Sequence, residues 1–390
     1  MTNNLCTEAG YISLNKHGEQ LCGDRVEIVD KDDACILVLA DGLGSGVKAN
    51  ILSTLTSKII STMVAGGMPI EECIDTIAST LPVCKVRQVA YSTFSVVRIL
   101  NNTLAELIQF DNPDVIVLRD GQRFQYPVTT RVVSGKTIHE SRFPVQENDI
   151  FIAMSDGAPF AGVGVEFNYG WQRDNIIDFA EANYHPDNSA KYVAANIVDE
   201  CNRLYHGEPG DDTTVAVVRI RARQSVNLVI GPPADPANDV KMMNLFFSKE
   251  GEKIVCGGTT SNIASRYLGK PIIPTLDYPD PEVPPISKIE GVDLVTEGVV
   301  TLSKVLKLGQ AFLDGTDTSA DWTSKKDGAS LIAKELFEKA TDINFFVGRA
   351  INPAHQNPDL PITFGIKIQL INSLAECLKK MGKRIKVSFF

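Results

Sequence analysis

Three short apolar runs and one shorter strand candidate in the first 225 residues each carry an acidic, glycine-containing turn at one end. The turns and their runs are Gly23-Asp24 before 26–29, Ala40-Asp41-Gly42-Leu43-Gly44 after 34–39, Ser155-Asp156-Gly157 after 150–154, and Gly210-Asp211-Asp212-Thr213-Thr214 before 215–220. Continuous apolar runs bounded by turn signals predict buried strands. The pattern therefore predicts strands that present carboxylates at their ends, with glycines that allow close backbone approach.

Helical spacing of apolar residues predicts the other elements of the first half. From 47 to 64 these residues recur along one face. Gly66-Gly67 ends this helix, and Pro69 suits the first position of a second helix that reaches about Leu81. Strands are expected from 92 to 133 and near 150, and two more helices at 173–182 and 189–204. This order predicts an α+β fold, a four-layer αββα sandwich with two sheets inside and helices outside.

The second half of the chain alternates strands with helices. Expected strands are 226–230, 253–256, 292–298, 343–347 and 384–389, and expected helices are 235–249, 257–267, a helix reaching 308, 329–340 and 364–381. The stretch 271–285 holds six of the 20 prolines and predicts an extended arm or loop. With a boundary near Gln224, we expect a domain at 1–224 and a smaller α/β domain at 225–390 with a largely parallel sheet.

Composition and charge narrow the class of protein. A hydrophobic content of 44% and a charged content of 22% are those of a globular protein, and neither a membrane-spanning stretch nor a signal peptide is evident, so we expect a cytoplasmic protein without membrane association. Eight scattered cysteines, including Cys22 near Asp24, predict reduced thiols. The net charge of −10 lies in residues 1–225, which carry 19 Lys and Arg against 29 Asp and Glu. This acidity argues against nucleic acid as a partner.

Each acidic turn taken alone has a simpler interpretation, since Asp-Gly is a common turn signal and Asp211-Asp212 has the composition of a solvated loop. Their recurrence at the ends of the most hydrophobic strands favours a shared role. Carboxylates gathered in one place repel one another unless a cation neutralises them. Oxygen ligands suit hard divalent ions, so the sequence predicts a metal site.

Taken in order, these motifs resemble the metal-dependent protein phosphatases, in particular the bacterial SpoIIE-type branch related to protein phosphatase 2C. The segments between them continue the resemblance: 91–97 is similar to the family's middle strand, 110–121 to its hairpin, and 147–150 to the lead into the third turn. The resemblance covers about 15–223. Residues 226–390 resemble no family that we can name.

The resemblance implies two divalent cations, Mn²⁺ or Mg²⁺, and roles for particular residues. Asp41 would bridge the cations, Gly42 would contribute its carbonyl, and Asp156 and Asp211 would hold the second cation. Asp24 would orient water, and Asp212 is a weaker candidate for a ligand or a supporting residue. Ligation by oxygen without histidine favours Mn²⁺ or Mg²⁺ over zinc.

The implied function is a serine/threonine phosphoprotein phosphatase that acts on a phosphorylated bacterial regulatory protein. We expect the C-terminal domain to regulate it. The alternative is a catalytically silent phosphatase-like scaffold or ligand-sensing regulator. The arginine that holds phosphate in eukaryote-like members has no convincing counterpart, and Arg25 is better interpreted as solvated or ion-paired. The helices from Val47 to Leu81, with the segment Pro82–Tyr91, are expected to act as a switch, or else simply to cover a sheet.

A glycine turn in the second half has two interpretations. Gly257, Gly258, Thr259, Thr260 and Ser261 lie between an expected strand and helix. Backbone amides and hydroxyls there suit a phosphate or carboxylate, but a helix cap with a tight turn explains the same residues and is favoured. We expect this domain to bind a small ligand or a protein partner. The sequence leaves open whether the protein forms a homodimer.

Overall fold

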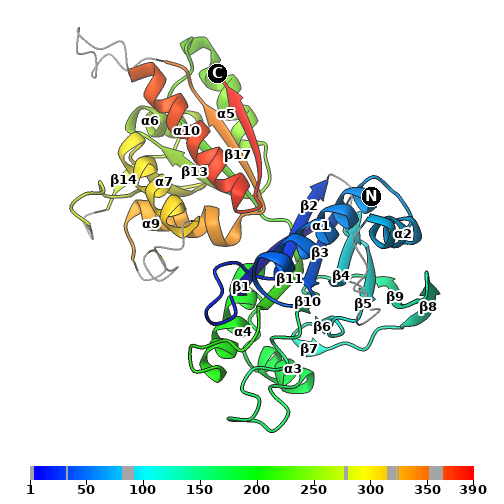
Figure 1. Ribbon diagram of the computed structural model, residues 1–390. Helices are drawn as coiled ribbons and strands as arrows, with labels where there is room; N and C mark the ends of the chain where they lie inside the picture. Colours follow the sequence, from blue (N-terminus) through cyan, green and yellow to red (C-terminus); the bar gives the residue numbers. More distant parts are fainter. Residues whose placement is uncertain are drawn as a thin grey trace. The chain divides into compact units, whose positions relative to one another are not determined.

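The computed structural model describes residues 4–31, 34–80, 92–275, 280–313, 322, 325–350 and 363–390. The chain divides into two compact units, Met1–Ala222 and Arg223–Phe390, whose elements are labelled in Figure 1. The predicted switch segment Pro82–Tyr91 and Cys84 lie outside the described residues.

The N-terminal unit contains two antiparallel sheets. The six-stranded sheet has the order β2 (Asp24–Lys31), β3 (Ala34–Gly42), β4 (Ser92–Leu100), β5 (Leu104–Phe110), β9 (Lys136–Pro144) and β8 (Thr129–Val133). The five-stranded sheet has the order β1 (Leu5–Leu14), β11 (Thr213–Ala222), β10 (Ile150–Met154), β6 (Ile116–Arg119) and β7 (Gln122–Arg123).

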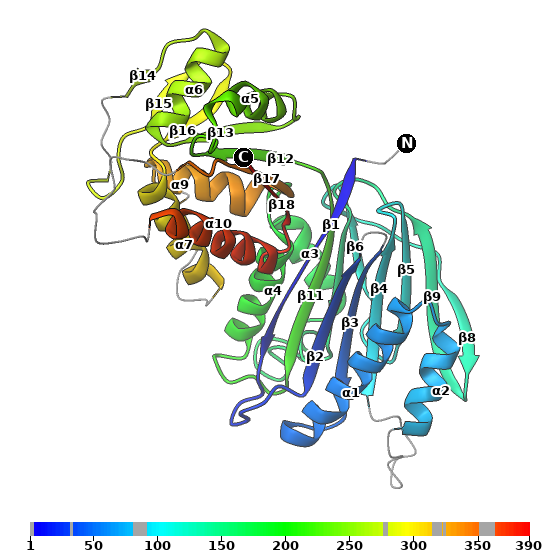
Figure 2. The ribbon, with the colours of Figure 1, turned by 90° about the horizontal axis from the view of Figure 1, so that it is seen from above.

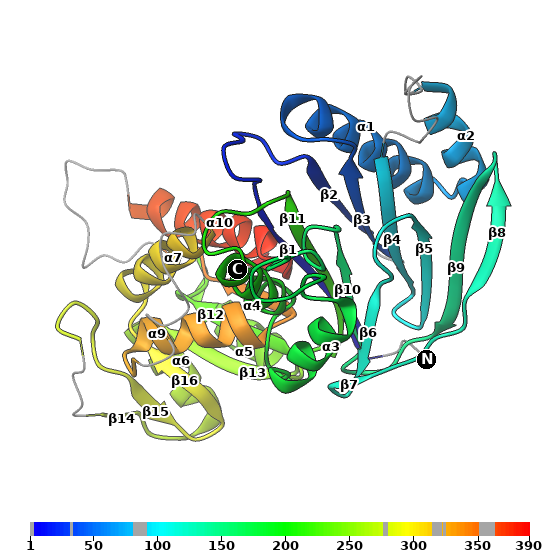
Figure 3. The ribbon, with the colours of Figure 1, turned by 60° about the horizontal axis from the view of Figure 1, so that its bottom comes forward.

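The two sheets pack face to face, with helices on their outer faces. A buried cluster that includes Leu37, Leu107, Phe151 and Val218 joins the inner faces of both sheets. Two further clusters place α1 (Gly46–Ala65) and α2 (Ile70–Thr80) on the six-stranded sheet, and α3 (Arg173–Ala182) and α4 (Ala190–Leu204) on the five-stranded sheet. Figure 3 shows the four layers in this order. The predicted αββα sandwich is confirmed.

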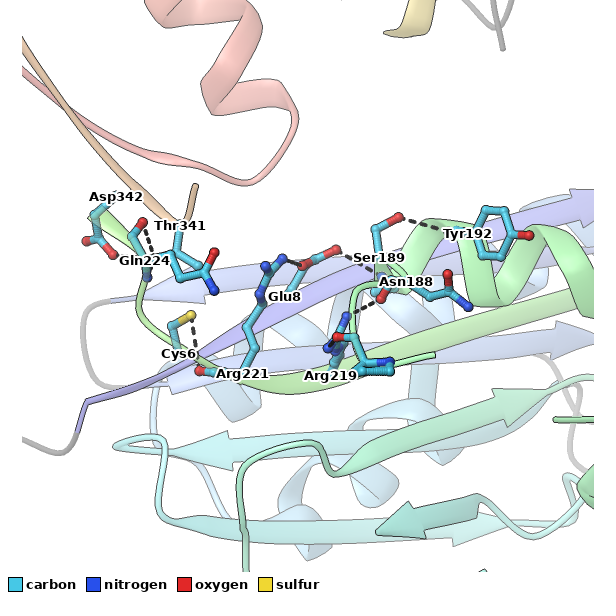
Figure 4. A network of polar contacts seen from close by, with 12 residues as sticks. Cys6, Glu8, Asn188, Ser189, Tyr192, Arg219, Arg221, Gln224, Thr341 and Asp342 are labelled. Atoms are coloured by element: carbon cyan, nitrogen blue, oxygen red, sulfur yellow. Dashed lines mark hydrogen bonds and ion pairs between the residues drawn. The ribbon is translucent and has the colours of Figure 1, made fainter. Parts of the chain in front are cut away.

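One end of β1 and β11 is held to the start of α4 by a polar network (Figure 4). Glu8 accepts the Ala190 N–H at 2.9 Å and pairs with Arg221 at 2.8 Å. Arg219, only 2% exposed, donates to the carbonyls of Asn188 and Pro186. The network lies near the last residues of β11, whereas Thr213 and the acidic turn before it lie at the start of this strand. The network is therefore remote from the acidic turn.

The C-terminal unit is built on a seven-stranded, largely parallel sheet, as predicted. Its strand order is β14 (Ile273–Pro274), β15 (Ser287–Ile289), β16 (Val292–Thr296), β13 (Glu252–Cys256), β12 (Ser225–Ile230), β17 (Asp342–Val347) and β18 (Arg384–Phe389). The pairs that join β16 to β18 through β13, β12 and β17 are all parallel. Such a sheet is covered on both faces.

Helices cover both faces of this sheet (Figure 2). One buried cluster packs α5 (Asp239–Phe247) and α6 (Gly258–Leu268) against the sheet, and another packs α7 (Val299–Leu313), α9 (Gly328–Ala333) and α10 (Thr363–Lys380) on the opposite face. Because β13 and β16 lie on one side of β12 and β17 and β18 on the other, the unit is doubly wound with its switch point between β12 and β17.

Several elements differ from those expected. Strand β1 was not predicted, the expected helix 235–249 begins with a 3-10 turn (Pro236–Asn238), and the expected helix 329–340 continues from α9 as a π-helix at Lys334–Lys339. The proline-rich stretch contributes the short strand β14.

The seven cysteines in the described part of the chain form no disulfide with one another. Within that same part, no helix is long and apolar enough to cross a membrane.

Candidate metal centre

The acidic turns of both sheets meet at one edge of the sandwich. Asp24 opens β2 directly opposite Asp41 near the end of β3. In the other sheet, Asp156 follows β10, and Asp211 and Asp212 precede the antiparallel strand β11. The Ser155 N–H donates to the Thr214 carbonyl at 3.0 Å, which continues the pairing of these strands into the turns.

Two glycines allow the turns to approach closely. A Cβ at Gly23 would lie 2.7 Å from Asp212 Oδ2, so the carboxylate of one sheet rests against the backbone of the other. A Cβ at Gly42 would collide with the Ala49 carbonyl in the first turns of α1, and the Gly42 N–H donates to the Gly23 carbonyl at 3.2 Å. A side chain at position 23 would therefore push the acidic turns apart, and one at position 42 would push the end of β3 away from α1.

Two of the carboxylates are buried with oxygen atoms that have no hydrogen-bond partner. Asp24 is 5% exposed, and both its carboxylate oxygens lack a partner within the described residues; Asp212 is 4% exposed and its Oδ2 likewise lacks one there. Buried polar groups are nearly always hydrogen-bonded, and an isolated buried charge is costly. A divalent cation would satisfy these oxygens, so the residues fit the predicted metal.

The hydroxyl groups of Ser155 and Thr214 lie beside Asp24 and also bond to other groups. Ser155 Oγ accepts the Thr214 N–H at 2.9 Å, and Thr214 Oγ1 pairs with Ser13 Oγ at 2.8 Å. These hydroxyls offset part of a rise in the pKa of Asp24 that burial causes and that Asp212 and Asp156 increase. The Asp24 carboxylate is therefore held next to polar groups that do not neutralise it.

The electrostatics place Asp41 at the centre of the cluster. Burial raises the pKa of Asp41, and so do the carboxylates of Asp24, Asp156, Asp211 and Asp212, in that order. The pKa of Asp156 is also raised, first by burial and then by Asp211. Asp24 is thus grouped with Asp212, Asp156 with Asp211, and Asp41 interacts with both pairs. Like charges this close favour a bound cation.

The acidic side chains do not form a complete set of metal ligands in this structure. Within the part of the chain that the structure describes, no three His, Cys, Asp or Glu side chains form a group that could hold a metal ion. Asp211 is turned outward: its Oδ1 lies 3.6 Å from Lys16 Nζ and accepts the Asp212 N–H at 3.0 Å.

Sequence reasoning missed Lys16 and Glu19, which lie between β1 and β2. The Lys16 N–H donates to Asp212 Oδ1 at 3.0 Å, and Glu19 Oε1 accepts the Ser45 hydroxyl at 3.1 Å. Ser45 precedes α1, as expected of a helix start, but its hydroxyl makes no capping bond within that helix. A basic residue a few positions before Gly23-Asp24 was the available signal for Lys16.

Two other predicted features have structural roles. Burial and Asp24 raise the pKa of the Cys22 thiol to about 12, so the thiol stays protonated. In the C-terminal unit, Thr260 Oγ1 accepts the Gly231 N–H at 2.8 Å and Ser261 Oγ donates to the Gly257 carbonyl at 2.9 Å. Two of the hydroxyls expected to bind an anion, those of Thr260 and Ser261, are thus engaged, while Gly258 and Thr259 are exposed.

The four-layer sandwich with acidic turns at one edge is the phosphatase 2C-like fold that the sequence predicted. Residues 31–221 match the family model described as Stage II sporulation protein E (SpoIIE). This match to the SpoIIE family supports a phosphatase. A search of curated proteins found no match for the chain.

Solved structures similar to this chain include phosphatase domains. The phosphatase domain and a fragment of the regulatory domain of the cell fate determinant SpoIIE from Bacillus subtilis is 21% identical, with a TM-score of 0.49, over 56% of this chain and 64% of that chain. The phosphatase domain alone, in a crystal form without domain swapping, is 20% identical with a TM-score of 0.44 over 56% and 94%. RsbX in complex with magnesium is 20% identical with a TM-score of 0.40 over 55% and 95%.

Proposed function

We propose that the N-terminal unit is a serine/threonine phosphoprotein phosphatase that uses two divalent cations, Mn²⁺ or Mg²⁺. The observation that carries this proposal is the pair of buried carboxylates, Asp24 and Asp212, whose unpartnered oxygens lie beside Asp41 in a unit that matches the SpoIIE family. A scaffold without chemistry would have no need for such costly groups at one edge.

The proposed roles follow from position in the cluster. Asp41 and the Gly42 carbonyl would bridge and hold the cations, Asp156 and Asp211 would hold the second one, and Asp24 would orient the attacking water. Asp212, which is buried and placed next to Asp24, is a stronger candidate ligand than the sequence indicated. When bound, such cations lower the pKa of water and neutralise charge on phosphoryl oxygens.

The reaction is hydrolysis of a phosphomonoester. The water oxygen forms a bond to phosphorus, the bond from phosphorus to the serine or threonine oxygen breaks, and that oxygen leaves with a proton as the alcohol. Inorganic phosphate is the second product. Asp24, whose carboxylate has no competing hydrogen bond within the described residues, is suited to hold the proton that the water loses.

A protein substrate is supported by the surface next to the acidic turns. Leu43, Val47, Ile51 and Leu55 are 37% to 63% exposed. The last three lie on α1 at intervals of four residues, so they form one stripe along the helix that begins beside Asp41 and Gly42. Exposed apolar side chains in a row suit contact with another protein, here a phosphorylated regulatory protein.

Regulation by the C-terminal unit is the second part of the proposal. In doubly wound sheets, ligands bind outside the carboxyl ends of the strands, near the switch point. The ends of β12 and β13 carry Gly231 and Gly257, both with positive φ. We propose that a small ligand or partner binds at this edge, with the exposed backbone of Gly258 and Thr259 contributing.

The test is hydrolysis of a phosphoserine peptide and of p-nitrophenyl phosphate by the full-length chain, with and without Mn²⁺. We expect turnover that requires the cation and falls at least about 10³-fold in Asp41→Ala, because the proposed bridging ligand is lost. Cation-independent turnover, or equal turnover in Asp41→Ala, would contradict the proposal. No turnover by folded protein with any cation would favour the scaffold.

A further inference from the structure

The loop between β1 and β2 is tied to the acidic turn that precedes β11. The Lys16 N–H donates to Asp212 Oδ1 at 3.0 Å, and the His17 N–H donates to the Pro209 carbonyl at 2.8 Å. Both bonds use the backbone of the loop. The Cα of Lys16 is therefore fixed next to Asp211 and Asp212 whatever side chain it carries.

The same loop is tied to the acidic turn of the other sheet. Glu19 accepts the Ser45 hydroxyl at 3.1 Å, and Asn50 Nδ2 donates to the Cys22 carbonyl at 2.8 Å. Ser45 and Asn50 lie at the start of α1, just after Asp41 and Gly42. The loop thus spans the turns of both sheets, which fixes Lys16 relative to the whole cluster.

The side chain of Lys16 places a positive charge at the rim of this cluster. Its Nζ lies 3.6 Å from Asp211 Oδ1, and its side chain is 37% exposed against 43% for Asp211. The ammonium also lowers the pKa of Asp156, against the larger effects of burial and Asp211. Among the ion pairs of the described residues, only this one includes an aspartate of the cluster, which consists of Asp24, Asp41, Asp156, Asp211 and Asp212.

We propose that the Lys16 ammonium binds the phosphate group of the substrate at the rim of the acidic cluster. A phosphomonoester carries a charge of about −1.5 to −2 at neutral pH, and lysine binds phosphate as a point charge on a flexible stem. Because Lys16 is partly exposed and adjacent to Asp211, a phosphate that reaches this residue meets the ammonium. This inference rests on the proposed phosphatase function.

A counter-ion role is the competing explanation. In that case Lys16 would only offset the charge of Asp211 and Asp156, and its removal would change the affinity for cations without changing the affinity for phosphate. The two explanations differ in what they predict for the substrate and for inorganic phosphate, the product.

The experiment compares Lys16→Met and Lys16→Arg with Lys58→Met in the full-length protein. Lys58 is an exposed lysine on α1 that pairs with Glu27 and serves as a control of equal charge change. We expect Lys16→Met to raise KM for a phosphoserine peptide about tenfold or more, with a smaller change in kcat, and Lys16→Arg to restore most of the loss. Lys58→Met should match the wild type.

A binding measurement makes the outcome independent of turnover. Calorimetric titration of inorganic phosphate into the Mg²⁺-loaded protein should show binding that weakens in Lys16→Met by the same factor as KM. Equal phosphate affinity in the wild type and in Lys16→Met, with altered Mg²⁺ affinity alone, would overturn the inference and leave the phosphatase proposal standing. Absence of both turnover and phosphate binding in the wild type would overturn both.

Discussion

Asp24 and Asp41 lie directly opposite each other in the antiparallel register of β2 and β3, at the edge where both sheets present acidic turns. Like charges opposite each other on neighbouring strands destabilise a sheet. Burial of Asp24, and its lack of hydrogen-bond partners among the described side chains, increase the cost. The fold thus carries a local instability that a cation would relieve.

The first prediction concerns two buried aspartates with opposite surroundings. In protein treated with a chelator at pH 8, Asp24→Asn should raise the free energy of unfolding by about 1 kcal/mol, because an unpartnered buried charge is removed. Asp149→Asn should lower it by about 3 kcal/mol, because Asp149 is fully buried and pairs with Arg119 at 2.8 and 2.9 Å. Denaturant unfolding measures both, and destabilisation of similar size in the two variants would contradict this prediction.

The second prediction concerns pH. Burial and mutual repulsion raise the pKa values of Asp24, Asp41 and Asp156 in the folded chain. An aspartate whose pKa is higher in the folded than in the unfolded chain stabilises the fold at a pH below its unfolded pKa of about 4. This stabilisation is lost as the pH rises through its pKa in the folded chain. Chelator-treated wild type should therefore lose stability relative to Asp41→Asn as the pH rises from about 4 to about 9, the folded pKa of Asp41.

Thermal unfolding at a series of pH values, with chelator and with Mn²⁺, checks this dependence. Stabilisation by Mn²⁺ should grow with pH, since the cation must displace protons. A difference between wild type and Asp41→Asn that does not change with pH would show that the carboxylates are not coupled in this way.

The third prediction separates stability from activity. Glu8→Gln should lower the free energy of unfolding by about 2 kcal/mol, since Glu8 pairs with the nearly buried Arg221 and accepts the Ala190 N–H (Figure 4). Because this network lies at the other end of β1 and β11 from the acidic turns, kcat/KM with Mn²⁺ at 25 °C should stay within twofold of the wild type. A large loss of activity in folded Glu8→Gln would contradict the separation.

The fourth prediction tests close backbone approach. In Gly42→Ala the new methyl group would collide with the Ala49 backbone, so the end of β3 and the start of α1 must separate. We expect the affinity for Mn²⁺ to fall at least about tenfold. Gly258→Ala is the control, because no atom lies within 4 Å of a Cβ at that position. Isothermal titration of both variants with Mn²⁺ gives the comparison, and unchanged affinity in Gly42→Ala would count against the geometry described.

Much of the fold could be predicted because its elements have strong local signals. The apolar faces of α3 and α4, and the continuous runs of β3, β10 and β11, are visible in the sequence. Strand β1 was missed because most of its residues are only partly buried, so its sequence lacks a clear apolar period. The π-helix at Lys334–Lys339 has no such signal either.

The candidate site, like the fold, could be predicted only in part from the sequence. Asp41 and Asp156 could be singled out because each lies at the end of an apolar strand, so local sequence fixes its position. The environment of Asp212 could not, because it depends on Gly23 and on the Lys16 N–H, about 190 residues earlier in the chain. For the same reason, only the structure could show that Lys16 lies next to Asp211.

The most direct test of this account is calorimetric titration of chelator-treated, full-length protein with Mn²⁺, for the wild type and for Asp41→Asn. Asp187→Asn, a substitution of a side chain that is 88% exposed, is the matched control. The account predicts two Mn²⁺ ions per chain in the wild type and in the control, and loss of at least one in Asp41→Asn. Absence of Mn²⁺ and Mg²⁺ binding to the folded wild type, or equal binding by Asp41→Asn, would contradict it.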